Sequence, residues 1–473
     1  MKTTRTIVSM ILSAALLPVC LTSCSGTKNL TKPQIEMPAY TVPGLDDGDS
    51  LCVADIEWWK FYTDSTLCYI ISETLDHNRD FMSAAARVEE LRQLYGVDKL
   101  CYMPVVTGVA GASRETNHYH DENYKLDVET DFKATLNWEI DLWGGLSAAR
   151  RRSAAKFMAS VEDMRAMQIT LVSQAATAYF NLVAFENELN IVRRTLATRD
   201  EAREKARLRF EGGLTSEIVY QQAQVEYATT AALIPGLERR IDMARNAITL
   251  LMGRFPADRL DGMSIHYFEE DLSLDMPAGV PSQLLERRPD LRSAEQNLRA
   301  ALESCGVAYS NQFPKLRLAV TGGWENDDFV NLFKSPFSYM LGNIAGTIFD
   351  FGRNRRKYKA SIAAYEQARF SYEKAVMAAF TEVADAAVTY RSSVATVNSR
   401  RQLRDAAYKY VTLANKQYIG GTINYIDVLD AHRRYFDAQI NYSNAVRDRY
   451  LAIAALYRAL GGGWNGQHVV KEK

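Results

Sequence analysis

The sequence contains little proline and little cysteine, and both shortages narrow the class of fold. Its 473 residues include only 12 prolines and 6 cysteines. Because proline interrupts helices, so low a content favours long helices over a loop-rich fold. The cysteines show neither metal-ligand spacing nor the density of a disulfide-stabilised domain. With a formal net charge of only −1, the composition predicts no nucleic-acid partner.

The motifs of common enzyme classes are also absent from the sequence. It has no Ser-His-Asp spacing, HExxH run, phosphate-cradling glycine loop or zinc cluster. The run 118–122 contains two histidines, but it lies between two predicted strands and is interpreted as a solvated loop. The run 286–290 is interpreted as a helix start, with Pro289 in the first turn and Asp290 facing the helix dipole. We therefore expect no enzymatic activity, no metal site and no non-covalent cofactor.

No apolar run after the N-terminal segment is long enough for a membrane-spanning helix, and that segment itself reads as a targeting signal. A positively charged start precedes an apolar stretch, residues 7–19, that is shorter than the roughly 20 residues that span a bilayer. The following Leu21-Thr22-Ser23-Cys24 resembles a bacterial lipobox, and Ser25 after it favours the outer membrane. The prediction is a signal peptide over 1–23, a covalent lipid on Cys24 and an extended tether over 24–55. The alternative is an ordinary signal peptide with a chance cysteine.

Four further cysteines remain in the mature chain. They are Cys52, Cys68, Cys101 and Cys305. Their spacing indicates structural cysteines, although an oxidising compartment leaves a Cys52–Cys68 bridge open.

The chain repeats itself with a constant offset. Gly144 and Gly352 open similar runs that lie 208 residues apart, and the same offset relates two Gly-Gly pairs and two helix-ending glycines. The Gly-Gly pairs are Gly212-Gly213 and Gly420-Gly421. We interpret the chain as a tandem duplication of one unit, which comprises a helix, two strands, a long helix, a glycine turn and a second helix. The predicted copies span 56–280 and 281–464, followed by a tail over 465–473.

Each copy contains a long heptad pattern. The first stripe is Phe157, Val161, Met164, Leu171, Ala175, Ala178, Leu182, Phe185, Leu189, Val192 and Leu196, with Gln168 as its one polar gap. The second is Ile362, Tyr365, Tyr372, Val376, Ala379, Val383, Ala386, Tyr390 and Val397, broken by Arg369. A period of 3.5 predicts helices that pack as coiled coils. Each helix is expected to run about 65 residues, or roughly 100 Å, before the Gly-Gly turn. Return helices are expected over 214–251 and 423–460, with Thr215 and Ser216, or Thr422 and Asn424, offering side chains at their starts.

The strand signal is strongest over residues 124–142. Apolar and polar residues alternate there for nineteen positions without a charge on the apolar face. A soluble strand usually alternates over 4–8 residues, whereas a strand that crosses a membrane in a barrel alternates over its whole length. Weaker strands are expected over 102–113, over 315–324 and ending at 344–348. Four strands cannot close a barrel, since the smallest have about eight, so the chain is predicted to assemble with further copies.

Several motifs, taken in order, resemble outer membrane efflux proteins of the TolC/OprM type. They are D-L-W-G at 141–144, R-F-E-G-G at 209–213, L-L-E-R-R-P-D-L at 284–291, F-D-F-G at 349–352, D-V-L-D-A at 427–431 and R-A-L-G-G-G-W at 458–464. The run I-E-W-W-K-F-Y-T-D at 56–64 resembles the lipoprotein, NodT-like branch. The resemblance implies a mainly α-helical homotrimer in which four strands per chain close a twelve-stranded β-barrel in the outer membrane. Long coiled-coil helices then form a tunnel across the periplasm, fed by a periplasmic adaptor and an inner-membrane pump of the resistance–nodulation–division (RND) class.

The resemblance also carries residue roles. The family's periplasmic gate matches Ile426, Asp427, Asp430 and Arg433, which fall close to one helix face. Three copies would form rings that narrow the tunnel, with the acids held shut by arginine; the alternative is a solvated face with local ion pairs. Many relatives carry an acid at the position of Val219, so the lock between coils is expected to be asymmetric or weaker here, with Glu217 and Gln221 as candidate substitutes. The turns at Gly212-Gly213 and Gly420-Gly421 match those that meet the adaptor.

Two other functions remain open on the residues alone. A type I secretion system uses an outer-membrane component of the same design, so protein export is an alternative to the efflux of drugs and toxic compounds. A structural lipoprotein that spaces the envelope layers would explain the heptads and Cys24, but it would not explain the alternating strand.

Overall fold

The computed structural model describes residues 57–62, 64–117, 125–256, 287–347 and 349–462. The chain divides into two compact units. The first, here called the sheet unit, comprises the described parts of Arg87–Val161 and Ser293–Lys374. The second, here called the helical unit, takes the described parts of Glu36–Ala86, Glu162–Arg292 and Ala375–Lys473.

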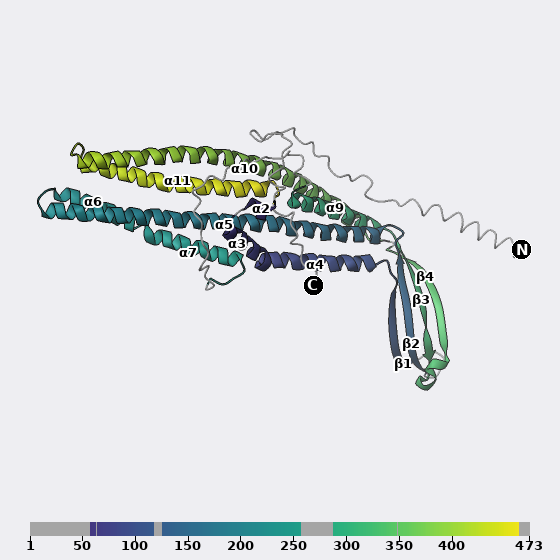
Figure 1. Cartoon of the computed structure of the whole chain (residues 1–473). Helices are drawn as coiled ribbons and strands as arrows, with labels where there is room; N and C mark the ends of the chain where they lie inside the picture. Colours follow the sequence, from purple (N-terminus) through teal and green to yellow (C-terminus); the bar gives the residue numbers. More distant parts are fainter. Residues whose placement is uncertain (1–56, 63, 118–124, 257–286, 348, 463–473) are drawn as a thin grey trace. The chain divides into compact units, whose positions relative to one another are not determined.

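The sheet unit contains four antiparallel strands in the order β1-β2-β3-β4 (Figure 1). They are β1 (Val105–Asn117), β2 (Lys125–Ile140), β3 (Lys315–Asn326) and β4 (Pro336–Ala345). Phe132 of β2 pairs with Ala110 of β1 and with Trp324 of β3, whose ring stacks on the Phe132 ring at 6.2 Å. Four strands were predicted, and all four are present; β1 starts and ends a few residues later than expected.

The two faces of the sheet differ in character. Directly paired residues of antiparallel strands point to the same face, so Leu136 shares a face with Val106 and Val320. On this apolar face Val106 is 66% exposed. The opposite face carries Thr135, whose hydroxyl lies 3.0 Å from that of Thr321, and Glu139, which pairs with Arg317 of β3. The predicted alternation of β2 is therefore confirmed, and its apolar face remains uncovered within one chain.

Two helices of 67 residues each dominate the chain, α5 (Gly145–Glu211) and α10 (Arg353–Ile419). Their length agrees with the expected 65 residues, and no residue of either predicted heptad stripe is exposed. An aspartate side chain caps the start of each helix. Asp141 accepts hydrogen bonds from the amides of Leu146 and Ser147. Asp350 accepts hydrogen bonds from the amides of Gly352 and Asn354. Such carboxylates satisfy amides that have no partner within the helix.

The return helices differ between the two copies. In the second copy α11 (Tyr425–Ala459) is continuous over 35 residues. In the first copy the expected helix over 214–251 is divided into α6 (Glu217–Ala231) and α7 (Ile234–Leu251). Pro235 lies in the first turn of α7, and proline has no amide hydrogen to donate to the preceding turn. The prediction of one continuous helix there was wrong, and the proline gives the reason.

Aromatic side chains hold the core of the helical unit. The short helices α2 (Trp58–Phe61) and α3 (Ser65–His77) pack there with parts of α5, α7 and α11. Phe61 stacks on Tyr457 with ring centroids 4.4 Å apart, and Tyr179 is fully buried. Asp64 accepts hydrogen bonds from the Leu67 amide and the Tyr179 hydroxyl, both at 2.9 Å. The run 56–64, which resembles the lipoprotein branch, therefore contributes buried side chains to this core.

The remaining helices are α4 (Arg79–Leu100), α9 (Pro289–Ser310) and the 3-10 helix η4 (Phe329–Lys334). Helix α9 begins at Pro289 as predicted, and Asp290 pairs with Arg288 at 2.7 Å. Cys68, Cys101 and Cys305 are free thiols, whereas Cys52 lies outside the described residues. Among the described helices, none combines the length and apolar character needed to cross a bilayer.

Candidate functional site at the helical hairpin ends

The predicted glycine turns close two helical hairpins of the helical unit (Figure 1). Gly213 and Gly421 both have φ of +74°, a backbone conformation that costs glycine little because it has no Cβ. The amide of Leu214 donates to the Arg209 carbonyl at 2.8 Å, and the amide of Thr422 donates to the Gln417 carbonyl at 3.0 Å. The two hairpin ends are therefore built alike, as the repeat predicted. Contact of Gly212, Gly213, Gly420 and Gly421 with an adaptor stays a prediction.

The predicted gate residues lie at the start of α11, just after the second turn. Ile426 is 58% exposed and Asp427 is also exposed. The Asp427 carboxylate accepts a hydrogen bond from the Asn424 amide at 3.2 Å. In this chain Asp427 therefore closes the first turn of its own helix, a structural use that the gate assignment did not include.

Asp430 is paired within its own helix. Its carboxylate accepts from Arg434 at 2.7 Å and from the Tyr410 hydroxyl at 3.5 Å. The hydrogen bond from Arg434 holds the pKa of Asp430 below its ordinary value. Arg433, the arginine that the gate assignment expected to neutralise this acid, has another partner within this chain, and its pairing in an assembled gate stays a prediction. Arg434 lies at i+4 from Asp430, which is the better spacing for a pair along one helix.

Arg433 instead crosses to the other hairpin. Its Nε donates to the Glu226 carboxylate of α6 at 2.6 Å. Glu226 is buried, with a side chain only 9% exposed, and Arg199 of α5 reaches its other oxygen at 3.1 Å. The Glu226 hydrogen bond raises the pKa of Arg433, while burial lowers the pKa of the more enclosed Arg199. We call Arg199, Glu226 and Arg433 the inter-hairpin triad.

Within the described residues, the triad forms an ion pair between the two hairpins, whereas Glu217 and Gln221 do not. The proposed substitutes, Glu217 and Gln221, are 3.4 Å apart and hydrogen-bond to each other on the surface of α6. The sequence motifs did not identify Glu226 as a site residue, although a comparison of the two copies indicates it. At the constant offset Glu226 corresponds to Arg434, so equivalent positions of the two return helices carry opposite charges.

A cavity of about 560 Å³ separates the two hairpins next to the triad. Its walls are apolar where Ala202, Val219 and Val428 line it, and polar where Arg199, Glu226, Asn415 and His432 do. His432 lies 3.4 Å from Asn415, and burial, helped by the charge of Arg199, lowers the pKa of His432. His432 is therefore neutral at neutral pH.

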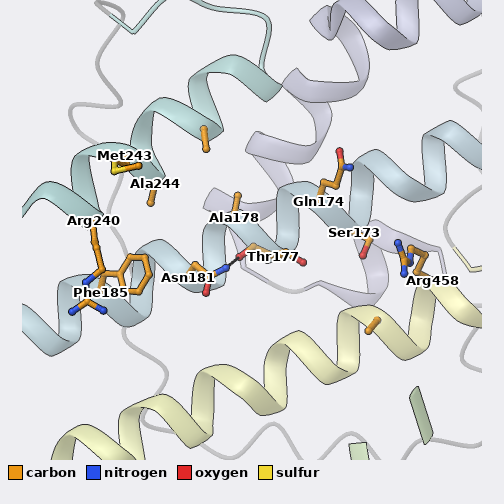
Figure 2. Close-up of a pocket in the computed structure, with 12 residues that line it drawn as sticks. Ser173, Gln174, Thr177, Ala178, Asn181, Phe185, Arg240, Met243, Ala244 and Arg458 are labelled. Carbon is orange, nitrogen blue, oxygen red and sulfur yellow. Dashed lines mark hydrogen bonds between the residues drawn. The ribbon is translucent and has the colours of Figure 1, made fainter. Parts of the chain in front are cut away.

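A second cavity, of about 660 Å³, lies in the helical unit between α5, α7 and α11 (Figure 2). Phe185, Met243 and Ala244 give it an apolar wall, and Arg240 and Arg458 line it as well. The Arg240 guanidinium lies 5.1 Å from the centre of the Phe185 ring. Neither cavity holds a nucleophile next to a base. In the part of the chain that the structure describes, no group of three His, Cys, Asp or Glu side chains forms a metal site.

Comparison with known proteins identifies the family of this chain. A model of the family described as "Outer membrane efflux protein" matches residues 70–254 and 280–462. The chain belongs to this family. It is an outer-membrane channel for efflux, as the motifs predicted.

Relatives with assigned roles cover almost the whole channel. The toluene efflux pump outer membrane protein TtgF of Pseudomonas putida is 29% identical over 92% of this chain and 91% of its own. The cation efflux system protein CusC of Escherichia coli is 28% identical over 95% and 98%. The open state of the MtrE outer membrane channel of Neisseria gonorrhoeae superposes with a TM-score of 0.80 at 26% identity, covering 93% of this chain and 99% of that one.

Some predicted features fall outside the described residues. They include the signal peptide over 1–23, the lipidation site Cys24, the tether over 24–55, the loop over 118–122 and the tail over 465–473.

Proposed function

We propose that the channel is a homotrimer and serves as the passive exit duct of a tripartite efflux system. The exposed apolar face of the four-stranded sheet carries the proposal. Within a bilayer, strands satisfy their backbone groups only in a closed barrel, and four strands are too few to close one. Three copies supply twelve strands, the number that the family resemblance implies.

The partners of this duct are a periplasmic adaptor and an inner-membrane pump of the RND class. The hairpin ends with their glycine turns are the surfaces proposed to meet the adaptor. The named relatives export toluene and cations, so their names do not agree on one substrate. We propose that small molecules pass through and that the pump selects them. A covalent lipid on Cys24 is proposed as an additional anchor in the outer membrane.

The gate of the duct is proposed to lie at the hairpin ends, where Ile426 and Asp430 ring the tunnel. The inter-hairpin triad supports this because it ties the hairpin that carries the gate residues to the other hairpin of the same chain. If the tunnel opens by separation of the hairpins, the hydrogen-bonded ion pair between Arg433 and Glu226 must break. The cavity beside the triad gives the hairpins room to move.

Two measurements on the purified protein in detergent test the duct. Light scattering coupled to gel filtration is expected to give the mass of three chains, and planar bilayers are expected to show discrete channel conductance. A monomer without conductance would overturn the proposal. The variant Arg433→Ala is expected to raise the conductance severalfold, because an ion pair of this exposure is worth about 0.2–1 kcal/mol and acts once per subunit. Arg447→Ala, which removes a pair on the far part of α11, is the matched control and is expected to conduct like the wild type.

A further inference from the structure

Two strongly basic tracts lie at the starts of the long helices, at equivalent places in the two copies. Residues 142–161 contain three consecutive arginines, Arg150 to Arg152, and Lys156, but no acid. Residues 351–365 contain Arg353, Arg355, Arg356, Lys357 and Lys359, again without an acid. The gate, the barrel and the hairpin ends make no use of this charge.

Most of this charge is exposed and has no ion-pair partner among the residues that the structure describes. All five basic residues of the second tract are exposed. For Arg355, Arg356 and Lys357, no carboxylate within the described part of the chain forms an ion pair. Within the described residues, Arg151 is the one basic residue of the first tract in an ion pair, with Glu303 at 2.8 Å, while Arg150 lies 5.4 Å above the ring of Tyr102. Such uncompensated charge is costly to concentrate unless an anion balances it.

Exposed aromatic side chains lie between the sheet and the second tract. Phe349 and Phe351 are 73% and 86% exposed, and their rings meet at 4.6 Å. Phe351 has φ of +56°, an unfavourable conformation for a residue with a side chain. In the first copy Trp143 occupies the corresponding stretch and is 42% exposed. Aromatic side chains are enriched where a membrane meets water. The wall of an aqueous tunnel would not favour exposed aromatic side chains in this way.

Each copy therefore presents the same order along the chain: an apolar strand end, then aromatic side chains, then basic side chains. The strand ends are Ile140 and Ile344, which lie on one face because both pair with Leu316. This is the order of environments from the hydrocarbon core of a bilayer through its interface to the phosphate headgroups. Basic side chains next to an anionic lipid surface are attracted by it, and the attraction falls off within a Debye length.

We propose that the two basic tracts bind the phosphate groups of anionic phospholipids in the leaflet next to the helix starts. Phe349, Phe351 and Trp143 lie in the interface of that leaflet and set the depth of the sheet. The inference rests on the proposed membrane-spanning barrel, but it assigns the lipid class and the residues that select it.

Lipid retention by the full-length protein tests the inference. Native mass spectrometry of the detergent-purified protein would compare bound dioctanoyl phosphatidylglycerol with dioctanoyl phosphatidylcholine. The wild type is expected to retain the anionic lipid preferentially. The triple variant Arg355→Gln, Arg356→Gln, Lys357→Gln is expected to lose at least about fivefold of that preference, the effect of one basic residue near an anionic surface. Raising salt from about 0.1 to 1 M, which shortens the Debye length from about 10 to 3 Å, is expected to weaken the wild-type preference.

The matched control removes three exposed basic residues farther along the same helix, in Arg400→Gln, Lys409→Gln, Lys416→Gln. It is expected to retain lipid like the wild type. Equal retention of the two lipids by the wild type, or an unchanged preference in the test variant, overturns the inference. A test variant that keeps its lipid preference but changes the ion selectivity of the pore would overturn it too, since the tract would then line the tunnel. Normal wild-type conductance in the same preparation separates these outcomes from a failure of the proposed duct.

Discussion

At the scale of single residues, Glu226 is the centre of the hairpin contact. It is a buried carboxylate held between two guanidinium groups, those of Arg199 and Arg433. Removing the charge of a buried acid leaves its partners unpaired, and that loss exceeds what the intact pair contributes. The gate assignment by resemblance named Arg433 but did not include its contact with Glu226 of α6, and the role of Arg433 in a gate stays a prediction.

Glu226→Gln is expected to loosen the contact between the hairpins. The amide keeps the shape but leaves Arg199 without a counter-charge, which we expect to cost about 1–3 kcal/mol. The readouts are a lower melting temperature and a higher conductance in planar bilayers. Glu217→Gln, which alters an exposed acid on the same helix, is the control and is expected to change neither. Equal behaviour of the two variants would show that the triad does not hold the hairpins together.

His432 makes the same contact sensitive to pH. Its pKa in the folded protein lies below the ordinary value of about 6.5, so the unfolded chain binds a proton first as the pH falls. The stability that neutral His432 contributes is thus present above about pH 6.5 and is lost below it. Thermal unfolding between about pH 7.5 and 5.5 measures this loss, and His432→Asn is expected to flatten the dependence. The lowered pKa of Asp430 acts only at more acidic pH, below its ordinary value of about 3.8.

At the scale of elements, the repeat sets two hairpins that are alike at their ends and different along their return helices. The ends are fixed by glycine at positive φ, and the difference arises at Pro235. The unbroken α11 carries all four predicted gate residues, whereas the interrupted α6 carries the acid that holds Arg433.

The glycine turn of the second hairpin allows a test with an internal control. An added Cβ at Gly421 meets no atom within 4 Å, so Gly421→Ala probes only the positive φ. A left-handed conformation costs a residue with a side chain about 1–2 kcal/mol. At Gly420 the nearest atom is 3.5 Å away and φ is not positive, so Gly420→Ala is expected to be nearly neutral. The difference in unfolding free energy between the two variants is the measurement, and a difference near zero would contradict the role given to this turn.

Much at this scale could be predicted from local patterns, and the exceptions have physical causes. The alternation over 124–142, the heptads and the Gly-Gly turns depend on short-range periodicity, and they predicted the strands and the 67-residue helices. Pro235 was visible in the sequence but was not weighed against the expected continuous helix. The partner of Arg433 lies 207 residues away in the chain, and no local period reports a contact of that kind.

At the scale of the whole molecule, the channel combines a sheet that exposes its apolar face with helices that bury theirs. The exposed face agrees with a chain that completes its fold only in a membrane and with further copies. The heptad stripes, which are covered within one chain, explain why the helical unit already has a core of its own.

Cys24→Ala tests the anchor that the N-terminal motif predicts. Loss of the thiol is expected to abolish acylation, so mass spectrometry of the mature N-terminus would find no lipid. Assembly and conductance are expected to persist, because the barrel provides its own hold in the bilayer and acyl chains add only about 0.8 kcal/mol per buried methylene. An unmodified wild-type N-terminus would disprove the lipoprotein assignment.

The opposite charges at equivalent positions of the two copies have a consequence for assembly fidelity. Glu226 and Arg434 occupy the same place in their repeats, and Val225 corresponds to Arg433. A first-copy hairpin therefore matches a second-copy hairpin and does not match another of its own kind, where each buried Glu226 would keep Arg199 of its own hairpin but would lack Arg433. Duplication alone would have produced interchangeable hairpins that could exchange between neighbouring chains. Divergence at these few positions gives each hairpin a distinct neighbour, so any ring built from them must alternate the two kinds.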